Sequence, residues 1–244
     1  MKYGIISDIH ANTQAFDAVL AMAQRAGVEK YIFLGDAVGY GADPAACLAR
    51  LRKLQKSPGC LCVAGNHDFA VAGRTHTRNY SINAVKAIDW TKTVLSPEDI
   101  SLIGGWPMVL EDNDLTAVHA NLHDPASWGY ILDIDDADPN FQKLKNKICF
   151  VGHSHRPVVF ESGKTVDWFL EEQFQLKDKS RYIVNAGSVG QPRDGDPRAC
   201  FVIYDTDKQV IEFRRAAYDI TTAQQRIIQA GLPRMLAERL AQGK

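Results

Sequence analysis

Histidine, aspartate and asparagine side chains recur in this sequence directly after short apolar runs. The densest example is Gly65-Asn66-His67-Asp68, which follows Leu61-Cys62-Val63-Ala64. Asparagine can offer a neutral oxygen to a metal ion, histidine can carry a proton, and aspartate can orient a histidine. Because such a tetrad is also typical of an ordinary polar turn, its meaning depends on the rest of the chain.

Similar residues follow four other apolar runs. Together with the tetrad they form a set of eight, namely Asp8, His10, Asp36, Asn66, His67, His119, His153 and His155, which holds five of the seven histidines. One histidine at a strand end is typical of a structural residue, whereas five at successive strand ends indicate one shared site at a sheet edge. Asp8 and His10 are two residues apart, so in an extended segment both would point to the same side.

These eight residues combine carboxylates, an amide and imidazoles, which is a ligand set for divalent metal ions. A tetrahedral site needs about four ligands, so the set suits two ions that share a carboxylate. Two ions about 3.5–4 Å apart can hold both oxygens of a phosphoryl displacement and ionise a water molecule at neutral pH. The pattern therefore predicts hydrolysis of a phosphate ester.

Strands and helices alternate in the first part of the chain, as they must to bring these residues together. Strands are predicted at 3–7, 31–34 and 60–64, and helices begin at Asn12-Thr13 and Asp43-Pro44, where a capping side chain precedes the helix. This order is typical of an α/β fold with its site along one sheet edge. Residues 221–240 are predicted to form an amphipathic helix broken at Gly231-Leu232-Pro233.

The middle of the chain and most of its second half are predicted as shorter elements. Helices are expected over 79–95, after Ser96-Pro97 and from Asp138-Pro139, and a hairpin is expected to join 106–110 and 115–118 around the acidic turn 111–114. Strands are expected at 148–151, 158–160, 165–169, 174–176, 182–185, 199–205 and 210–215. The acidic segment 133–138 lacks the glycine of a calcium loop, which favours an exposed loop and helix cap.

Composition limits the class of protein. The 244 residues contain no linker-like tract, so we expect one domain spanning 1–244. The net charge of −1 gives no general attraction to duplex nucleic acid or to a membrane surface. Five cysteines without a Cys-x-x-Cys pair argue against a disulfide framework or a zinc ribbon. Without a signal-peptide core or a membrane-length apolar run, the expectation is a soluble cytoplasmic protein whose oligomeric state stays open.

Five spaced motifs of this sequence resemble those of the calcineurin-like metallophosphoesterases. In order they are Asp8-x-His10, Gly35-Asp36, Gly65-Asn66-His67-Asp68, His119 and Gly152-His153-x-His155. The later segment Asn185-Ala186-Gly187-Ser188 is similar to a loop of the small bacterial, phosphodiesterase-like branch. The resemblance covers the whole chain. It implies a four-layer α-β-β-α sandwich of two mixed sheets, with a di-metal site at the strand ends.

The resemblance also implies roles for individual residues. The ligands would be Asp8, His10, Asp36 and His155 for one ion, and Asp36, Asn66, His119 and His153 for the other. Manganese is the favoured ion, and iron, zinc or nickel are alternatives because such sites accept all of them. His67 would face the substrate, donating to a phosphate oxygen or protonating the leaving group, while Asp68 would hold its orientation. A hydroxide between the ions would attack phosphorus in line.

The sequence differs from one branch of this superfamily in two motifs, and these differences bear on the class of substrate. Its protein serine/threonine phosphatases resemble Gly-Asp-x-x-Asp-Arg-Gly and Gly-Asn-His-Glu, whereas here Asp36 is followed, after Ala37, by Val38-Gly39-Tyr40-Gly41, and the tetrad ends in Asp68. The phosphate-gripping arginine is missing, which favours a small phosphodiester or nucleotide-type ester over a phosphoprotein. The candidate substrate contacts are Arg193, His123, Tyr130 and Arg74. The alternatives are a protein phosphatase, a non-catalytic metal-bound scaffold for protein partners, and a single-metal hydrolase or lyase.

Overall fold

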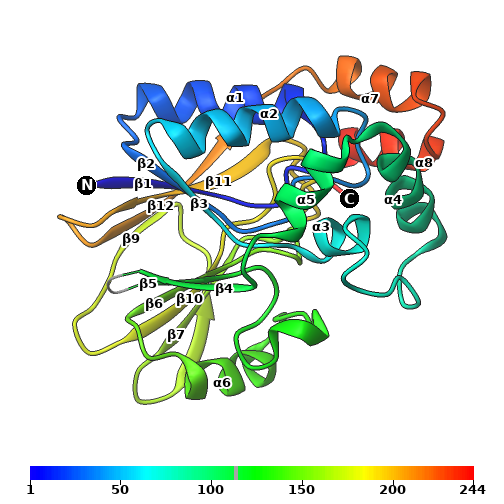
Figure 1. Ribbon diagram of the computed structural model, residues 1–244. Helices are drawn as coiled ribbons and strands as arrows, with labels where there is room; N and C mark the ends of the chain where they lie inside the picture. The colour runs from blue at the N-terminus through cyan, green and yellow to red at the C-terminus, as the bar shows by residue number, and fades with distance from the viewer. Residues whose placement is uncertain (113–114) are drawn as a thin grey trace.

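The computed structural model describes residues 1–112 and 115–244, and they form four layers (Figure 1). Two six-stranded mixed sheets pack face to face, and helices cover both outer faces. This architecture confirms the predicted α/β sandwich of two mixed sheets. The acidic turn predicted at 111–114 includes Asn113 and Asp114, which lie outside the described residues.

Sheet 1 contains the three strands that the first part of the sequence predicted. Its members are β1 (Lys2–Ile6), β2 (Lys30–Phe33), β3 (Cys60–Cys62), β9 (Gln173–Gln175), β11 (Ala199–Asp205) and β12 (Val210–Ala216), in the order β3-β2-β1-β11-β12-β9. β1, β2 and β3 are parallel, and β11 runs antiparallel to β1. Since Ile5 pairs with Ile32 and Ile32 pairs with Leu61, the three parallel strands end at the same edge.

Sheet 2 has a parallel centre of the same kind. Its members are β4 (Val109–Asp112), β5 (Leu115–Val118), β6 (Ile148–Val151), β7 (Val158–Ser162), β8 (Val166–Phe169) and β10 (Arg181–Asn185), in the order β4-β5-β6-β10-β7-β8. β5, β6 and β10 are parallel. Thr116 pairs with Cys149 and Cys149 pairs with Ile183, so these strands also end together.

Helices form the outer layers and one end of the molecule. They are α1 (Thr13–Arg25), α2 (Pro44–Lys56), α3 (Asn66–Val71), α4 (Ile82–Val94), α5 (Pro97–Gly104), α6 (Ile134–Lys143), α7 (Ile220–Gln229) and α8 (Arg234–Glu238), with 3₁₀ turns η1 (Pro125–Ser127) and η2 (Arg239–Gln242). In Figure 1, α1 and α2 lie over sheet 1 and α6 lies on the opposite outer face, against sheet 2. The remaining helices gather at the end where the parallel strands stop.

The predicted helix caps differ in what they bind. The Asn12 side-chain oxygen accepts a hydrogen bond from the Ala15 N–H at 3.1 Å, so it caps α1 as expected. Asp43 precedes α2 but makes no capping bond to that helix. Its carboxylate accepts from Thr13 Oγ1 at 2.9 Å and forms an ion pair with Arg226. Asp43 therefore connects α1, α2 and α7 near the site end of the molecule.

The start of α6 was predicted wrongly. We expected Asp138-Pro139 to open this helix, but it begins at Ile134 and contains Pro139. The Asp133 side chain caps it by accepting from the Asp136 N–H at 3.0 Å, so the helix is nucleated one turn earlier. Proline near a helix start removes only one main-chain bond, which this cap helps to offset.

The core lies in separate layers because successive strand residues face opposite sides. Ile5 packs between the two sheets with Ile32 and Phe150, whereas Ile6 packs under the outer helices with Phe16. All five side chains are fully buried. Both faces of β1 are therefore apolar, which explains its nearly continuous hydrophobic sequence.

Replacing Phe16 with alanine should lower the free energy of unfolding by about 3–5 kcal/mol, because a fully buried aromatic ring is lost and a cavity remains. Urea denaturation of metal-free wild type and variant measures this change. The exposed Ile82 provides the control, since Ile82→Ala should change stability by less than about 1 kcal/mol. Equal losses for the two variants would contradict the layered core.

Within the described ranges, no helix combines the length and the apolar character needed to cross a bilayer. The five cysteines are free thiols and all are buried. Cys60 and Cys62 lie side by side, with their sulfur atoms 3.8 Å apart. Burial raises the pKa of the Cys149 thiol and of the Cys200 thiol to about 12, so both stay protonated and act as small packing residues.

Candidate metal centre and substrate cleft

The ends of five parallel strands bring the seven predicted metal ligands together. β1 ends before Asp8 and His10, β2 before Asp36, β3 before Asn66, β5 before His119, and β6 before His153 and His155. All seven side chains are buried. Three overlapping groups of their carboxylate and imidazole atoms, one of them including His67, are close enough to hold a metal ion. The strand ends thus form one shared site, as the sequence predicted.

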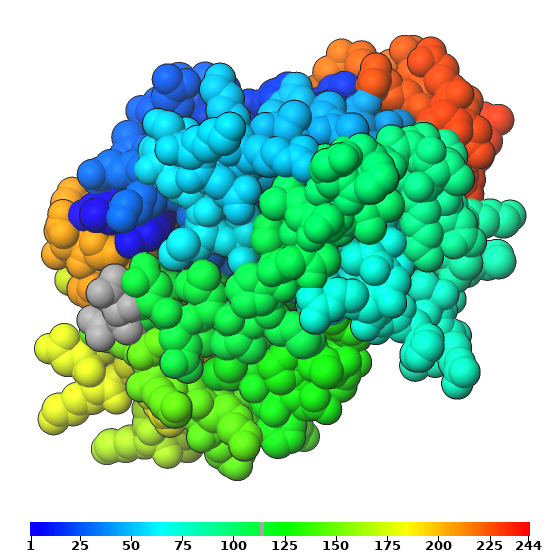
Figure 2. Space-filling view, in the orientation of Figure 1, coloured from blue at the N-terminus to red at the C-terminus, as the bar shows by residue number. Residues whose placement is uncertain are grey.

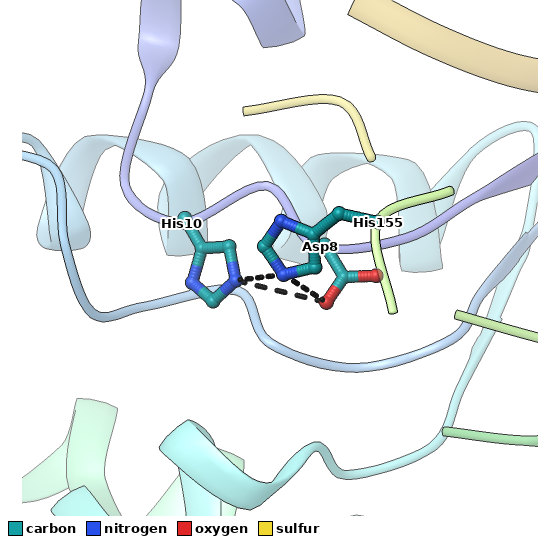
Figure 3. Close-up of side chains that lie close together, drawn as sticks. All are labelled: Asp8, His10 and His155. Carbon is teal, nitrogen blue, oxygen red and sulfur yellow. Dashed lines mark hydrogen bonds and ion pairs between the residues drawn. The ribbon is translucent and has the colours of Figure 1, made fainter. Parts of the chain in front are cut away.

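The first cluster consists of Asp8, His10 and His155 (Figure 3). The Nε2 atoms of the two histidines are 3.1 Å apart. Asp8 Oδ1 lies 3.2 Å from His155 Nε2 and 3.6 Å from His10 Nε2. Figure 3 shows the two rings and the carboxylate pointing toward one another, so three ligand atoms surround a common point.

The second cluster consists of Asp36, Asn66, His119 and His153. His119 Nε2 is its centre, 3.4 Å from Asp36 Oδ2, 3.1 Å from Asn66 Oδ1 and 3.2 Å from His153 Nδ1. This set contains one carboxylate, one amide oxygen and two imidazoles. Such a mixture suits a divalent ion of intermediate softness.

Asp36 belongs to both clusters. Its Oδ2 atom lies 3.4 Å from His119 Nε2 and 3.6 Å from His10 Nε2. Its Oδ1 atom accepts a hydrogen bond from the His67 N–H at 2.8 Å, which fixes the orientation of the carboxylate. One oxygen atom therefore lies between the two groups of ligands, as a bridging carboxylate would.

Each histidine of the two clusters is oriented by a backbone carbonyl. The accepting groups are the carbonyls of Val38 for His10 Nδ1, Leu34 for His119 Nδ1, Gln191 for His155 Nδ1 and Trp128 for His153 Nε2. When one ring nitrogen donates to a carbonyl, the other carries a lone pair if the ring is neutral. The lone pairs then face one another across about 3 Å, an arrangement that a metal ion would stabilise.

Asp8 supplies a second observation that fits a metal ion. Its Oδ2 atom accepts from Ser7 Oγ at 2.6 Å and from the His153 N–H at 3.0 Å. Its Oδ1 atom is buried and has no hydrogen-bond partner among the described residues. A buried carboxylate oxygen without a partner is costly, and here it points at His10 and His155. The residues present therefore fit a bound cation.

The buried carboxylates and imidazoles of the site shift one another's pKa values. Burial disfavours ionisation of Asp8, but the neighbouring histidines, His155 foremost, outweigh it and hold the pKa well below its usual range. Burial lowers the pKa of His155 to about 3 and that of His153 to about 4. Burial alone would also lower the pKa of His119, but Asp36 and Asp8 reverse the effect and raise it to about 9. The pKa values of Asp8 and Asp36 are both lowered, so these carboxylates stay ionised, and the rings of His153 and His155 are neutral.

The backbone at these strand ends differs from the extended conformation we expected. Positive φ angles occur at five ligands, Asp8 (52°), His10 (47°), Asp36 (59°), His153 (65°) and His155 (59°). The left-handed region costs a residue with a side chain about 1–2 kcal/mol. Asp8 and His10 therefore converge because the chain turns sharply, held by hydrogen bonds from the Asp8 N–H to the Gly35 carbonyl and from the His10 N–H to the Asp36 carbonyl.

Gly65 allows β2 and β3 to approach each other at the site. A Cβ atom at this position would overlap both the carboxylate and the backbone nitrogen of Asp36. Any larger residue would displace the carboxylate that the two clusters share. The glycine before Asn66 is therefore required by space, since its φ of −94° is open to any residue.

Asp68 does not hold His67, contrary to our expectation. Its two carboxylate oxygens accept hydrogen bonds from the N–H groups of Asp36 at 2.8 Å, Ala37 at 3.0 Å and Gly65 at 3.0 Å. The first turn of α3 directs this side chain toward the loop after β2, because residues in a helix point away from their sequence neighbours. Asp68 thus fixes the loop that carries the shared carboxylate, and it acts on the site through the backbone.

His67 lies beside the first cluster, on the wall of a cleft that adjoins both clusters. Its ring is 5.0 Å from that of His10, 4.5 Å from that of Tyr40 and 5.5 Å from that of Tyr80. Its Nδ1 atom has no hydrogen-bond partner among the described residues. Burial lowers the pKa of His67 to about 3, so the ring is neutral at pH 7. A neutral ring still carries one N–H that can donate to a ligand in the cleft.

A cavity of about 870 Å³ opens next to the two clusters. Of the predicted substrate contacts, Arg193 and Tyr130 line it, and the Tyr130 ring stacks on His153 at 4.3 Å. The structure does not bring Arg74 or His123 into its lining. The Arg74 guanidinium lies over the Phe69 ring at 4.5 Å, and His123 is exposed. Neither residue is therefore part of the candidate site.

Sequence reasoning missed several residues of the cleft. Tyr40, Tyr80 and Trp128 line it. Tyr80 Oη accepts from Asn66 Nδ2 at 2.8 Å and donates to the Asn66 carbonyl at 3.0 Å, so it positions a predicted ligand. Only Tyr40 had a local signal, since it follows Asp36 in a glycine-rich loop. Tyr80 lies in a segment whose sequence pattern indicates only a helix.

Comparisons with known proteins agree with this geometry. Residues 1–209 match the model of the calcineurin-like phosphoesterase superfamily domain. An uncharacterized protein of Methanocaldococcus jannaschii, MJ0912, is 38% identical over 98% of this chain and 97% of its own length. A metallophosphoesterase from Sphaerobacter thermophilus is 38% identical, with a TM-score of 0.86 over 100% of this chain and 99% of that one.

A more distant structure shares only the fold. The hypothetical protein PH1004 from Pyrococcus horikoshii is 18% identical and superimposes with a TM-score of 0.83 over 100% of this chain and 98% of its own. The family model and the Sphaerobacter protein go beyond the fold, because both are described as phosphoesterases, a class of metal-dependent phosphoric ester hydrolases. The match extends over most of the chain and includes every strand that carries a predicted ligand. This chain therefore belongs to the calcineurin-like phosphoesterase superfamily.

Proposed function

We propose that this protein is a di-metal phosphoesterase that hydrolyses small phosphodiesters or nucleotide-type phosphate esters. The observation that carries the proposal is the position of Asp36 Oδ2, within 3.6 Å of a ligand nitrogen in each of the two clusters. A carboxylate oxygen shared in this way serves two ions better than one. Hydrolysis of a phosphate ester is the reaction that such a pair supports.

The proposed ligands follow the two clusters. Asp8, His10, Asp36 and His155 hold one ion, and Asp36, Asn66, His119 and His153 hold the other. Manganese is our first choice, with iron, zinc and nickel as alternatives, because carboxylate, amide and imidazole donors suit all of these ions. When bound, the ions supply positive charge for the phosphate oxygens and an ionised water molecule as nucleophile.

The residues of this chain position the substrate around that chemistry. His67 lines the cleft beside Asp36 and donates a hydrogen bond to the phosphate group, or a proton to the leaving group. Asp68 holds the loop that carries Asp36, through its bonds to backbone N–H groups. Tyr130 and Arg193 lie on the wall of the cleft, where they face the rest of the ester. Burial of the ligands keeps bulk water away from the charges of the site.

The size and lining of the cleft favour a small substrate. Its volume of about 870 Å³ falls in the range of ordinary small-molecule sites. Its aromatic residues Tyr40, Tyr80, Trp128 and Tyr130 can contact an organic group such as a nucleoside. The loop after Asp36 has no arginine, unlike the motif of the protein serine/threonine phosphatases. These features support a small ester in preference to a phosphoprotein.

Removal of metal tests the proposal directly. Protein treated with EDTA and dialysed should lose hydrolysis of bis(p-nitrophenyl) phosphate, and Mn²⁺ should restore it, because the ions supply the nucleophile. Fe²⁺, Zn²⁺ and Ni²⁺ are compared in parallel, and metal analysis should return two ions per chain. A phosphoserine peptide assayed under the same conditions should be hydrolysed at least about tenfold more slowly.

Each alternative function gives a different result in this assay. One ion per chain in the active protein would favour a single-metal hydrolase. Failure to hydrolyse any ester with any of the four metals would favour a non-catalytic scaffold. Full activity after complete metal removal would contradict the proposed chemistry. Preference for the phosphopeptide would assign a protein substrate.

A further inference from the structure

The C-terminal segment of the chain forms one wall of the substrate cleft. α7, α8 and η2 pack against α4 through a cluster that includes Ala87, Ile227 and Leu236. Figure 2 shows this segment, in orange and red, against the green surface of α4 at one end of the molecule. Its contributions to the cleft are Met235, Glu238, Arg239, Gln242 and Lys244. All five lie beyond residue 209, where the match to the family model ends.

Two arginine side chains line this cleft, and neither forms an ion pair with an aspartate or glutamate side chain of the described residues. Arg193 Nη2 donates to Gln191 Oε1 at 2.8 Å, and Arg239 Nε donates to the backbone oxygen of Lys244. The nearby carboxylate of Glu238 is paired with Arg234 at 2.9 Å. The cleft therefore carries two guanidinium charges that no side-chain carboxylate of the described residues balances.

The two charges affect each other. Burial, followed by the charge of Arg193, lowers the pKa of Arg239. Half-buried guanidinium groups that repel each other are costly, and an anion between them would remove most of that cost. A phosphate group is the natural candidate, because guanidinium groups bind its oxygens in a bidentate manner.

The pair lies beside the predicted metal ligands and is not part of them; the Arg193 N–H donates to the carbonyl of His155 at 3.2 Å. The Arg193 guanidinium carbon lies 5.6 Å from the centre of the Tyr40 ring, and that ring lies 4.6 Å from the ring of His10. Tyr40 thus lies next to both Arg193 and the first cluster. Arg239 comes from the C-terminal segment, which supplies none of the predicted metal ligands, so an anion bound there would lie beside the metal centre and not on it.

We propose that Arg193 and Arg239 bind a second phosphate group of the substrate, at a distance from the ester that is hydrolysed. This inference rests on the proposed function and narrows it to phosphate esters that carry a separate phosphate, such as a phosphorylated nucleotide. The C-terminal segment is then a specificity element added to the catalytic fold. Arg239 acts in substrate binding, so its loss raises KM and leaves kcat nearly unchanged.

A matched pair of substrates tests this subsite. Thymidine 3′-(p-nitrophenyl phosphate) and its 5′-phosphorylated form share the same scissile bond and leaving group, and they differ by one phosphate. With Mn²⁺-loaded wild type, we expect the 5′-phosphate to lower KM about tenfold. Arg239→Gln should remove most of this preference, and Arg239→Lys should retain part of it because the charge remains. Thermal unfolding of both variants with Mn²⁺ verifies that the fold is intact.

Arg25→Gln is the matched control. Arg25 lies on α1, is exposed and does not line the cleft, so this variant should keep the full preference. Equal KM values for the two substrates in wild type would overturn the subsite while the proposed hydrolysis stands. An undiminished preference in Arg239→Gln would overturn it as well. Hydrolysis of neither substrate would contradict the proposed function itself.

Discussion

Asp36→Asn should lower turnover by about a thousandfold, or ~4 kcal/mol of transition-state stabilisation, and leave fewer than two metal ions per chain. The reason lies in the two oxygens of this carboxylate. Oδ1 accepts from the His67 N–H, whereas Oδ2 faces His10 and His119. In the variant, the amide oxygen would keep the bond to the His67 N–H, and the NH₂ group would face both clusters. An NH₂ group cannot ligate a metal, so the shared ligand is lost.

Two measurements separate this effect from unfolding. Metal analysis after dialysis counts the ions, and thermal unfolding with and without Mn²⁺ reports binding to the folded protein. Mn²⁺ should raise the Tm of wild type and have little effect on the Tm of Asp36→Asn. Asp89 on α4 is exposed, so Asp89→Asn should behave like wild type. Two tightly held ions in the Asp36 variant would disprove the bridging role.

Much of the candidate site could be predicted because it depends on topology. Residues that follow parallel strands of one sheet meet at one edge, whatever the detailed backbone conformation. Asp36 and Asn66 follow β2 and β3 and come together for this reason. The apolar runs that mark the strands are visible in the sequence, and so are the polar residues after them. The position of each polar residue directly after a predicted strand was sufficient to predict that these residues lie together at the sheet edge.

Backbone conformation at the strand ends could not be predicted in the same way. Asp8 and His10 have positive φ angles, which are uncommon at residues other than glycine, although aspartate and histidine adopt them more often than most. Long-range hydrogen bonds to the loop after β2 hold this conformation, for example from the His10 N–H to the Asp36 carbonyl. The convergence of these side chains was expected, but the extended geometry offered as its cause was wrong.

The direction in which individual side chains point could not be predicted from the sequence either. Asp68 follows His67 directly, which suggested contact, yet their positions in α3 send Asp68 toward the backbone of Asp36 and Ala37. For the C-terminal segment, the sequence likewise predicts the elements but not which side chains reach the cleft. An amphipathic pattern at 221–240 indicates that the segment packs, but nothing in it indicates that Arg239 reaches a cleft whose lining extends back to Asp36.

His67→Ala should retain both metal ions and lose about a hundredfold to ten-thousandfold in kcat. Its ring lines the cleft beside the metal ligands, and its Nδ1 atom has no partner among the described residues. The His67 N–H to Asp36 Oδ1 bond comes from the backbone, so it survives the substitution and the ligands stay in place. Metal analysis and kcat are measured together. His123→Ala is the control, because His123 is exposed and outside the cleft.

The leaving group distinguishes the two roles open to His67. Because burial lowers its pKa to about 3, the ring is neutral at pH 7 and is suited to donate a hydrogen bond to a phosphate oxygen. The loss in His67→Ala should then be similar for p-nitrophenyl and phenyl esters of the same phosphate. A loss that is much larger for the phenyl ester, whose leaving group needs a proton, would assign proton transfer instead. If His67→Ala turned over both esters as fast as wild type, His67 would have no part in the reaction.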